Sequence, residues 1–210
     1  CALPISSLEF LLMFVIFIVI YWVIRDFGAE AQAAFGIGGR IMQSIFLPAM
    51  AISFAAAPIA GQNFGAKRYD RVRETFKVTL FFGTAIMLTL SLLCHLTPEL
   101  MVRPFTDDPE VVTMTVTYLQ IVSWNFIFSG LVMAGGSLFQ GMGDTRPSLI
   151  ASATRTVTFV APAIWLSYQP GMRIEYVWYL SVASVIFQSL LAMWLLNRTF
   201  KRKLAIPAAS

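Results

Sequence analysis

Long apolar runs separated by short charged stretches dominate this chain. A helix needs about 20 mostly apolar residues to cross a hydrocarbon core about 30 Å thick. Six stretches of the sequence meet this requirement, with charged residues gathered mainly between them. They predict membrane-spanning helices over about 4–24, 31–63, 76–96, 111–140, 147–168 and 176–197, followed by a tail over 198–210.

The composition agrees with this pattern. Of the 210 residues, 58% are hydrophobic and 12% are charged, whereas a soluble domain has about 45–50% apolar and about 25% charged residues. So few charges cannot cover a soluble surface. We therefore expect an all-α integral membrane protein in which residues 1–210 form a single six-helix membrane domain, with the lipid bilayer as its first partner.

Basic residues are distributed unevenly between the loops. If successive spans cross the bilayer in opposite directions, ten basic residues fall on one side and three on the other. The ten are Lys67, Arg68, Arg71, Arg73, Lys77, Arg146, Arg198, Lys201, Arg202 and Lys203, and the three are Arg25, Arg103 and Arg173. The positive-inside rule then places both ends of the chain in the cytoplasm. It also explains the net charge of +4 without a nucleic-acid partner, although anionic-lipid or nucleic-acid binding is a less favoured alternative.

Clustered titratable groups, which an enzyme would need, are missing from the sequence. It has one histidine, His95, and no Cys/His spacing typical of a metal site, no paired carboxylates in one span and no phosphate-binding glycine loop. We therefore expect no enzyme activity, no metal and no cofactor. His95 lies near the end of a span, where an interfacial position is the simpler interpretation than proton handling.

Of the charged residues inside the predicted spans, Glu9 and Arg40 are the two that we expect to mark a functional site, because a charge there costs about 2.5–3.5 kcal/mol. Glu9 could face a hydrated cavity and take up a proton, which makes it a candidate for ion coupling. Alternatively, it could lie at the cytoplasmic interface. Arg40 belongs to a polar stripe whose offsets of 0, 4, 8 and 11 share one helical face. The stripe, formed by Gln32, Gly36, Arg40 and Gln43, is either a solute-cavity wall or an interhelical contact.

Aromatic and polar residues begin the second half of the fourth span. Trp124, Asn125, Phe126 and Phe128 could line a pocket for flat apolar cations. Aromatic residues at helical spacing also occur in ordinary helix packing, which is the alternative interpretation.

Three segments resemble one transporter family. Residues 58–66 read P-I-A-G-Q-N-F-G-A, which is similar to the P-x-x-G-Q-N-x-G-A signature of the multidrug and toxic compound extrusion (MATE) transporters. Residues 140–147 resemble the link after helix ten of that family, and residues 33–40 resemble the start of its helix eight. The signature residues matched in the first two segments are Pro58, Gly61, Gln62, Asn63, Gly65, Ala66, Gln140, Gly141, Gly143 and Pro147.

The resemblance implies the C-terminal six-helix lobe of a twelve-helix exporter, with an N-terminal lobe as its partner. It further implies export of organic, often cationic or aromatic, small molecules from a bacterial cytoplasmic membrane, in exchange for H⁺ or Na⁺. Some branches carry acidic residues where this chain has Leu12 and Ser129, so the chain resembles the DNA-damage-inducible F-like branch. Export of larger anionic or lipid-linked solutes, and a non-transporting truncated subunit, are the alternatives.

Overall fold

The computed structural model describes the backbone of residues 2–203 and the side chains from residue 7 onward, so part of the expected tail lies outside the described residues. Within this range the chain is helical and contains no strand. The elements are α1 (Ala2–Ile24), a 3-10 turn η1 (Arg25–Phe27), α2 (Ala29–Gly65), α3 (Tyr69–Leu96), α4 (Pro98–Val102), α5 (Pro109–Val122), α6 (Trp124–Gly141), α7 (Arg146–Ser167) and α8 (Ile174–Lys203).

Five of these helices are long and apolar enough to cross a membrane: α1, α2, α3, α7 and α8. The consecutive helices α5 and α6 are long and apolar enough only when taken together, and they are bent by 46° relative to each other. The expected all-α bundle is therefore confirmed, with five single-helix spans and a sixth where the bent pair counts as one span.

The bend divides the fourth expected span at Ser123. Neither proline nor glycine occurs at this position, so the sequence carries no signal for the break. The Ser91 hydroxyl on α3 donates a hydrogen bond to the Ser123 carbonyl at 3.2 Å. A side chain that binds a backbone carbonyl in this way is a recognised cause of helix kinks.

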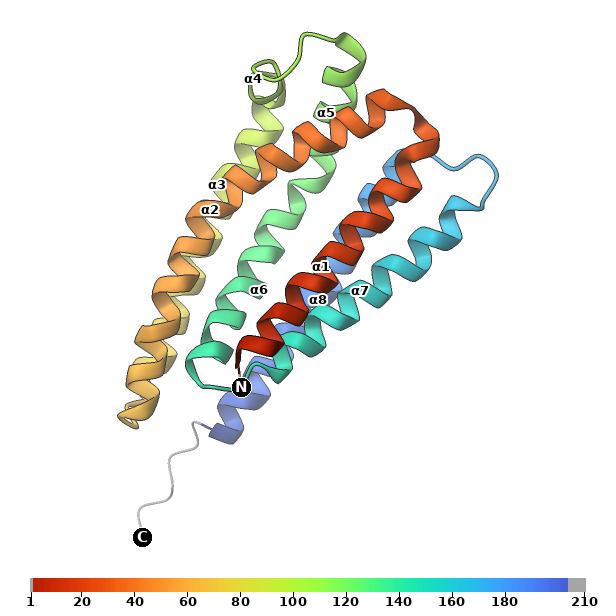
Figure 1. The fold of residues 1–210 in the computed structure, drawn as a ribbon. Coiled ribbons are helices and arrows are strands. Elements are labelled where there is room, and N and C mark those ends of the chain that lie inside the picture. Colours follow the sequence, from red (N-terminus) through yellow and green to blue (C-terminus); the bar gives the residue numbers. More distant parts are fainter. Residues whose placement is uncertain (1, 204–210) are drawn as a thin grey trace.

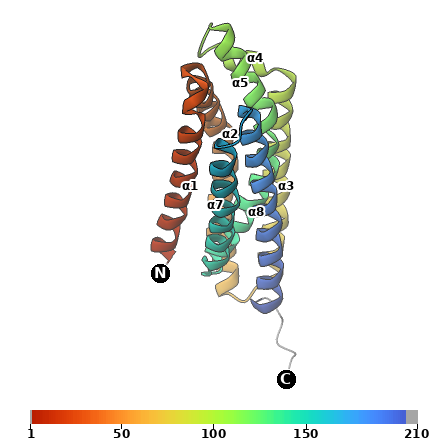
Figure 2. The ribbon, with the colours of Figure 1, turned by 90° about the vertical axis from the view of Figure 1, so that its right-hand side faces the viewer.

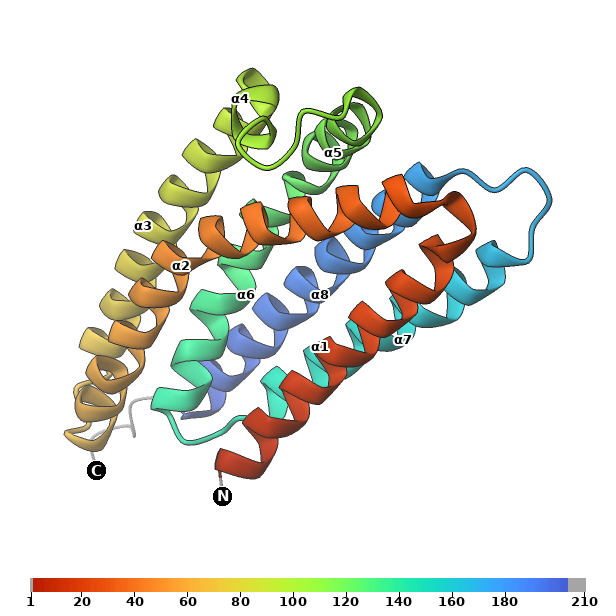
Figure 3. The same ribbon diagram turned by 45° about the horizontal axis from the view of Figure 1, so that its top comes forward.

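Helix α2 contains 37 residues, and at about 1.5 Å per residue it is longer than the hydrocarbon core is thick. Pro48 and Pro58 both lie inside it. Its axis changes direction along its length (Figure 3). A helix of this length tilts or projects beyond the core.

The beginning of α1 and the end of α8 lie at the same end of the bundle, together with the α2–α3 and α6–α7 links (Figures 1 and 2). The α1–α2 turn, α4 and the α7–α8 loop lie at the other end (Figure 1). Helix α1 packs along α7, and it diverges from α2 after their shared turn (Figure 3). The basic residues of the α2–α3 link and of the last turn of α8 therefore gather at one end of the bundle.

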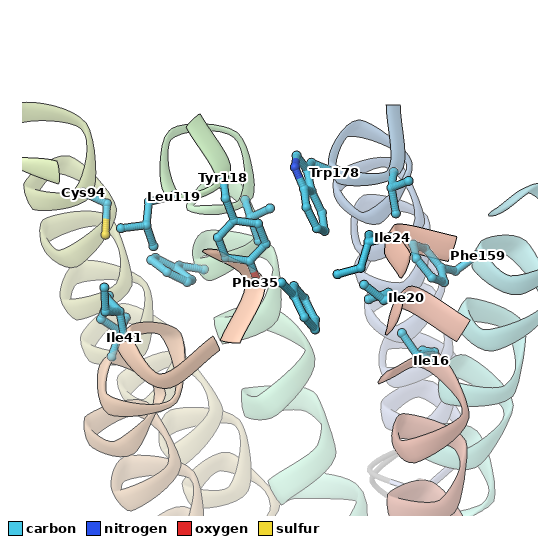
Figure 4. Packing of buried hydrophobic residues seen from close by; sticks show 14 of the residues in the cluster. Ile16, Ile20, Ile24, Phe35, Ile41, Cys94, Tyr118, Leu119, Phe159 and Trp178 are labelled. Carbon is cyan, nitrogen blue, oxygen red and sulfur yellow. The ribbon is translucent and has the colours of Figure 1, made fainter. Parts of the chain in front are cut away.

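In the core near the α1–α2 turn, aromatic rings from three helices pack together: Phe35, Tyr118 and Trp178 (Figure 4). Phe35 on α2 stacks on Trp178 of α8 with ring centroids 5.7 Å apart. Tyr118 on α5 meets Trp178 edge-on at 4.7 Å, and its hydroxyl donates to the Met42 sulfur at 2.8 Å. This cluster fixes α2, α5 and α8 against one another.

Helices α2 and α6 end in the same way. After α2, Lys67 adopts a left-handed φ of 56°, and the Arg68 amide donates to the Asn63 carbonyl at 2.9 Å. After α6, Gly143 has a φ of 68°, and the Asp144 amide donates to the Phe139 carbonyl at 2.9 Å. Both are Schellman helix ends; the first directly follows the signature segment 58–66, and the second lies within the segment 140–147.

Candidate solute cavity

A cavity of about 290 Å³ lies between α1, α2, α6, α7 and α8, and is called the polar cavity below. Phe10 on α1 and Phe54 on α2 line it and are each 62% exposed. The cavity therefore opens beside α1 and α2, where these two helices diverge. Its polar lining residues are Glu9, Ser53, Ser137, Gln140, Ser148, Ser152, Arg155, Thr156 and Gln188.

Glu9 brings an acidic group to this cavity from the second turn of the apolar helix α1. Its side chain is half-buried. The Oε1 atom is buried and has no hydrogen-bond partner. A carboxylate oxygen without a donor is costly away from water, so Glu9 brings an unsatisfied acceptor to the lining of the cavity.

Arg155 brings a basic group to the same cavity from the middle of α7. Its Nε atom is buried and has no hydrogen-bond acceptor. Among the charged residues inside the expected spans, Glu9 and Arg40 are the predicted functional candidates, and Arg155 is not one of them. The signal was present in the sequence, because Arg155 is a charged residue within the expected span 147–168.

Among the residues with described side chains, no ion pair joins Glu9 to Arg155. Both residues thus line the polar cavity, and each has a buried polar atom without a hydrogen-bond partner. One acid and one base give this site no net formal charge.

The remaining polar lining is made of neutral side chains. Gln188 on α8 is 5% exposed. The hydroxyls of Ser137 and Thr156 donate to carbonyls of their own helices, at 2.9 Å and 3.0 Å. Their oxygens keep lone pairs that can accept hydrogen bonds. The polar cavity thus combines two opposite charges with uncharged groups that can bind an ion, water or a polar solute.

The polar stripe expected on the second span lies elsewhere. Gln32, Arg40 and Gln43 are exposed on α2, and Gly36 is half-buried. None of the four lines the polar cavity. The stripe is therefore a surface of this bundle, available to a partner or to solvent.

The residues expected at the start of α6 also lie outside the polar cavity. Trp124 is 51% exposed and meets the His95 ring edge-on at 5.2 Å. Asn125 is buried and donates from Nδ2 to the Ser181 hydroxyl at 3.2 Å. Phe128 and Ser129 are half-buried. For Asn125 this geometry is that of a helix-packing residue joining α6 to α8.

His95 lies at the break between α5 and α6. Its Nδ1 atom is 2.9 Å from the Ser91 carbonyl oxygen and 3.2 Å from the Ser123 hydroxyl. The ring is half-buried. It therefore contacts Ser123 at the bend and Trp124 at the start of α6, a placement that the sequence pattern did not predict.

The two signature segments have mainly structural contacts. Gln140 lines the polar cavity, whereas the other nine signature residues do not. Gln62 is exposed, and the Asn63 Nδ2 donates to the Ile59 carbonyl at 2.8 Å within its own helix. Gly61 and Gly141 face each other across the α2–α6 contact.

Among the side chains from residue 7 to residue 203, no group of three or more His, Cys, Asp or Glu residues could hold a metal ion. The site is instead a charged, partly apolar cavity inside a bundle of six spans. These features define an integral membrane protein of the helical-bundle class with a polar cavity at membrane depth. The MatE family profile matches residues 5–166. The chain belongs to the MatE family.

Several curated relatives match this chain. A probable multidrug resistance protein NorM of Thermotoga maritima is 25% identical over 175 residues, covering 79% of this chain and 36% of the relative. The multidrug export protein MepA of Staphylococcus haemolyticus is 26% identical over 212 residues, covering 98% of this chain and 44% of the relative. The chain thus spans less than half the length of these relatives.

The fold is also that of solved MATE structures. An outward-facing multidrug resistance MATE family transporter of the MOP superfamily superposes with a TM-score of 0.89 at 17% sequence identity. The superposition covers 97% of this chain and 46% of that one. At this identity the likeness establishes the fold of the bundle.

Proposed function

We propose that this chain forms the C-terminal lobe of a MATE-type secondary active exporter, which moves organic, often cationic or aromatic, compounds out of the cell. The observation that carries the proposal is Glu9, whose unpartnered carboxylate oxygen faces a cavity inside a membrane bundle of the MatE family. Coverage of less than half of each relative supports the interpretation as one lobe of two. The multidrug names of these relatives support the substrate class.

Coupling requires that the driving ion bind one conformation more tightly than the other. In this proposal H⁺ or Na⁺ binds Glu9, and solute binding competes with it while the two lobes alternate between outward-open and inward-open states. The mouth of the polar cavity beside α1 and α2 faces the N-terminal lobe. The exposed stripe of Gln32, Arg40 and Gln43 lies on the same helix α2 and forms part of the wall between the lobes.

The membrane orientation follows from charge. The end of the bundle that carries the α2–α3 link and the last turn of α8 lies in the cytoplasm of a bacterial cell, because basic residues are retained on that side. Leu12 on α1 and Ser129 on α6 replace acidic residues of other branches, which supports the DNA-damage-inducible F-like branch.

A second candidate function is export of anionic solutes on the same fold. One observation favours it, which is the presence of Arg155 in the polar cavity. A competition assay between a cationic dye and anionic solutes distinguishes the two candidates, because the better solute displaces the other from a shared site.

The test of the proposal is dye efflux from energised cells. Four samples are compared: this chain alone, this chain with a six-helix N-terminal lobe, and the pair carrying either Glu9→Gln or Glu110→Gln. Glu110 is an exposed acid on α5 and serves as the matched control. We expect efflux from the pair and from its Glu110→Gln form, and loss of efflux with Glu9→Gln.

Efflux by the chain alone would contradict the two-lobe proposal. Absence of efflux from the pair, with both parts in the membrane, would favour a non-transporting subunit.

A further inference from the structure

Arg155 and Glu9 face one cavity with opposite charges, and neither is paired with the other. From this arrangement we infer that the polar cavity binds zwitterionic solutes, with an anionic group held by Arg155 and an ammonium group held by Glu9. The inference deepens the proposed transport function by naming a substrate class for the same cavity. The comparisons assign no role to Arg155.

The chemistry of Arg155 points to an anion. A guanidinium group stays charged and has five donors but no acceptor. In this protein the Nε donor is buried and unsatisfied at membrane depth, where an uncompensated charge is expensive. A carboxylate or phosphate oxygen is the acceptor that matches this donor best, because two of its oxygens can bind the guanidinium at once.

The chemistry of Glu9 points to the complementary charge. Its orphan Oε1 can accept a hydrogen bond from an ammonium group, which has donors and no acceptor. A solute with only one charge would satisfy one of the two groups and leave the other unsatisfied. A zwitterion satisfies both and keeps the cavity neutral.

The walls of the cavity define the rest of the solute. Phe10, Met13, Met50, Phe54 and Met133 line it from α1, α2 and α6. These flexible methionine and aromatic phenylalanine side chains can pack against the apolar part of a solute, whose shape can vary. The volume of about 290 Å³ corresponds to roughly ten water molecules at liquid density. An amino-acid-sized solute with an apolar side chain fits this space.

The test is a binding measurement on the purified protein in lipid nanodiscs at pH 7. Three probes are compared, each with a phenyl ring on a two-carbon chain that carries the charged groups. They are phenylalanine (zwitterion), 2-phenylethylammonium (cation) and 3-phenylpropionate (anion). We expect phenylalanine to bind at least about tenfold more tightly than either of the others, since each charged contact contributes a factor of about ten or more. Equal affinities for the three probes, or no binding of phenylalanine, would overturn the inference.

Variants separate the two ends of the solute. Arg155→Gln should remove the preference for phenylalanine over 2-phenylethylammonium, and Glu9→Gln should remove its preference over 3-phenylpropionate. Arg155→Lys keeps the charge without the planar fork and should bind phenylalanine with intermediate affinity. Controls are Arg146→Gln, an exposed arginine on the same helix, and Glu110→Gln.

Size-exclusion profiles and melting temperatures without probe confirm that each variant is folded. If Arg155→Gln fails to fold, Arg155→Lys carries the test, and an unchanged preference in that variant contradicts the role of the guanidinium fork. Binding needs neither an ion gradient nor a second lobe in motion. Dye efflux without selective phenylalanine binding would therefore overturn this inference and leave the proposed export function intact.

Discussion

Gly61 on α2 and Gly141 on α6 meet backbone to backbone. A Cβ atom on Gly61 would lie 3.1 Å from the Gly141 carbonyl oxygen, and a Cβ atom on Gly141 would lie 2.6 Å from the Ala57 carbonyl oxygen. The two segments that resemble the transporter signature, far apart in sequence, are thus in direct contact. Small residues at such crossings let membrane helices approach closely.

We expect Gly141→Ala to lower the free energy of unfolding by about 1–3 kcal/mol, because the added methyl group must push backbone atoms apart. Gly61→Ala should have a smaller effect, since its nearest contact is looser. Thermal melting of the purified protein measures both. Gly65→Ala is the control, because a Cβ atom there meets nothing within 4 Å; equal melting temperatures for Gly141→Ala and the control would contradict the contact.

Gly38 lies against the ring of Tyr118, so that an added Cβ atom would overlap the ring. Tyr118 cannot move aside easily, because Trp178 and Phe35 pack against it. We expect Gly38→Ala to destabilise the protein by about 1–3 kcal/mol. The neighbouring Gly39→Ala meets nothing within 4 Å and should leave the melting temperature nearly unchanged.

A double-mutant cycle checks this second prediction. Replacement of Tyr118 with a smaller side chain, as in Tyr118→Leu, should reduce the cost of Gly38→Ala. A cost that stays the same in both backgrounds would show that the Tyr118 ring is not the cause.

The two Schellman helix ends predict changes of opposite sign. Lys67 holds a left-handed conformation that costs an L-residue with a side chain about 1–2 kcal/mol, so Lys67→Gly should stabilise the protein or leave it unchanged. Gly143→Ala introduces that cost at the other end and should destabilise it by about 1 kcal/mol. Melting temperatures of the two variants test this, and stabilisation by Gly143→Ala would contradict the assigned geometry.

Asp144 in the α6–α7 link forms ion pairs with two residues in the last turn of α8. It lies 2.9 Å from Arg202 and 3.4 Å from Lys203, and its side chain is 16% exposed. We expect Asp144→Asn to lower stability by about 1 kcal/mol and to do so less at high salt, because the pair is partly screened. Glu99→Gln, which loses a pair exposed on both sides, should have little effect.

Sequence patterns predicted the fold more fully than the site. A long apolar run that crosses a bilayer has few stable conformations other than a helix, because its backbone hydrogen bonds must be satisfied internally. This is why the bundle could be predicted. Glu9 is predictable as a candidate because a charged residue in an apolar run is conspicuous, and the structure places it in the lining of the polar cavity. The stripe through Arg40 does share one face of α2, but helical spacing alone cannot tell which face meets the polar cavity.

Contacts between distant segments explain what was missed. Arg155 gains its significance from sharing a cavity with Glu9, and the contact between Gly61 and Gly141 exists only once α2 and α6 cross. The break at Ser123 depends on a hydroxyl from Ser91 on another helix. None of these relationships has a local signature in the sequence.

The most direct test of the account is gradient-driven dye transport in proteoliposomes. The two-lobe protein is reconstituted into proteoliposomes. In one assay, ethidium uptake is measured with an imposed pH or Na⁺ gradient. In a second assay, exchange of ethidium across the membrane is measured without a gradient. We predict that Glu9→Gln abolishes gradient-driven uptake, whereas exchange continues at a reduced rate, because the polar cavity remains but has lost the carboxylate for which ion and cationic solute compete. Full gradient-driven uptake by Glu9→Gln, equal to that of the Glu110→Gln control, would contradict the coupling role of Glu9 and with it the central claim.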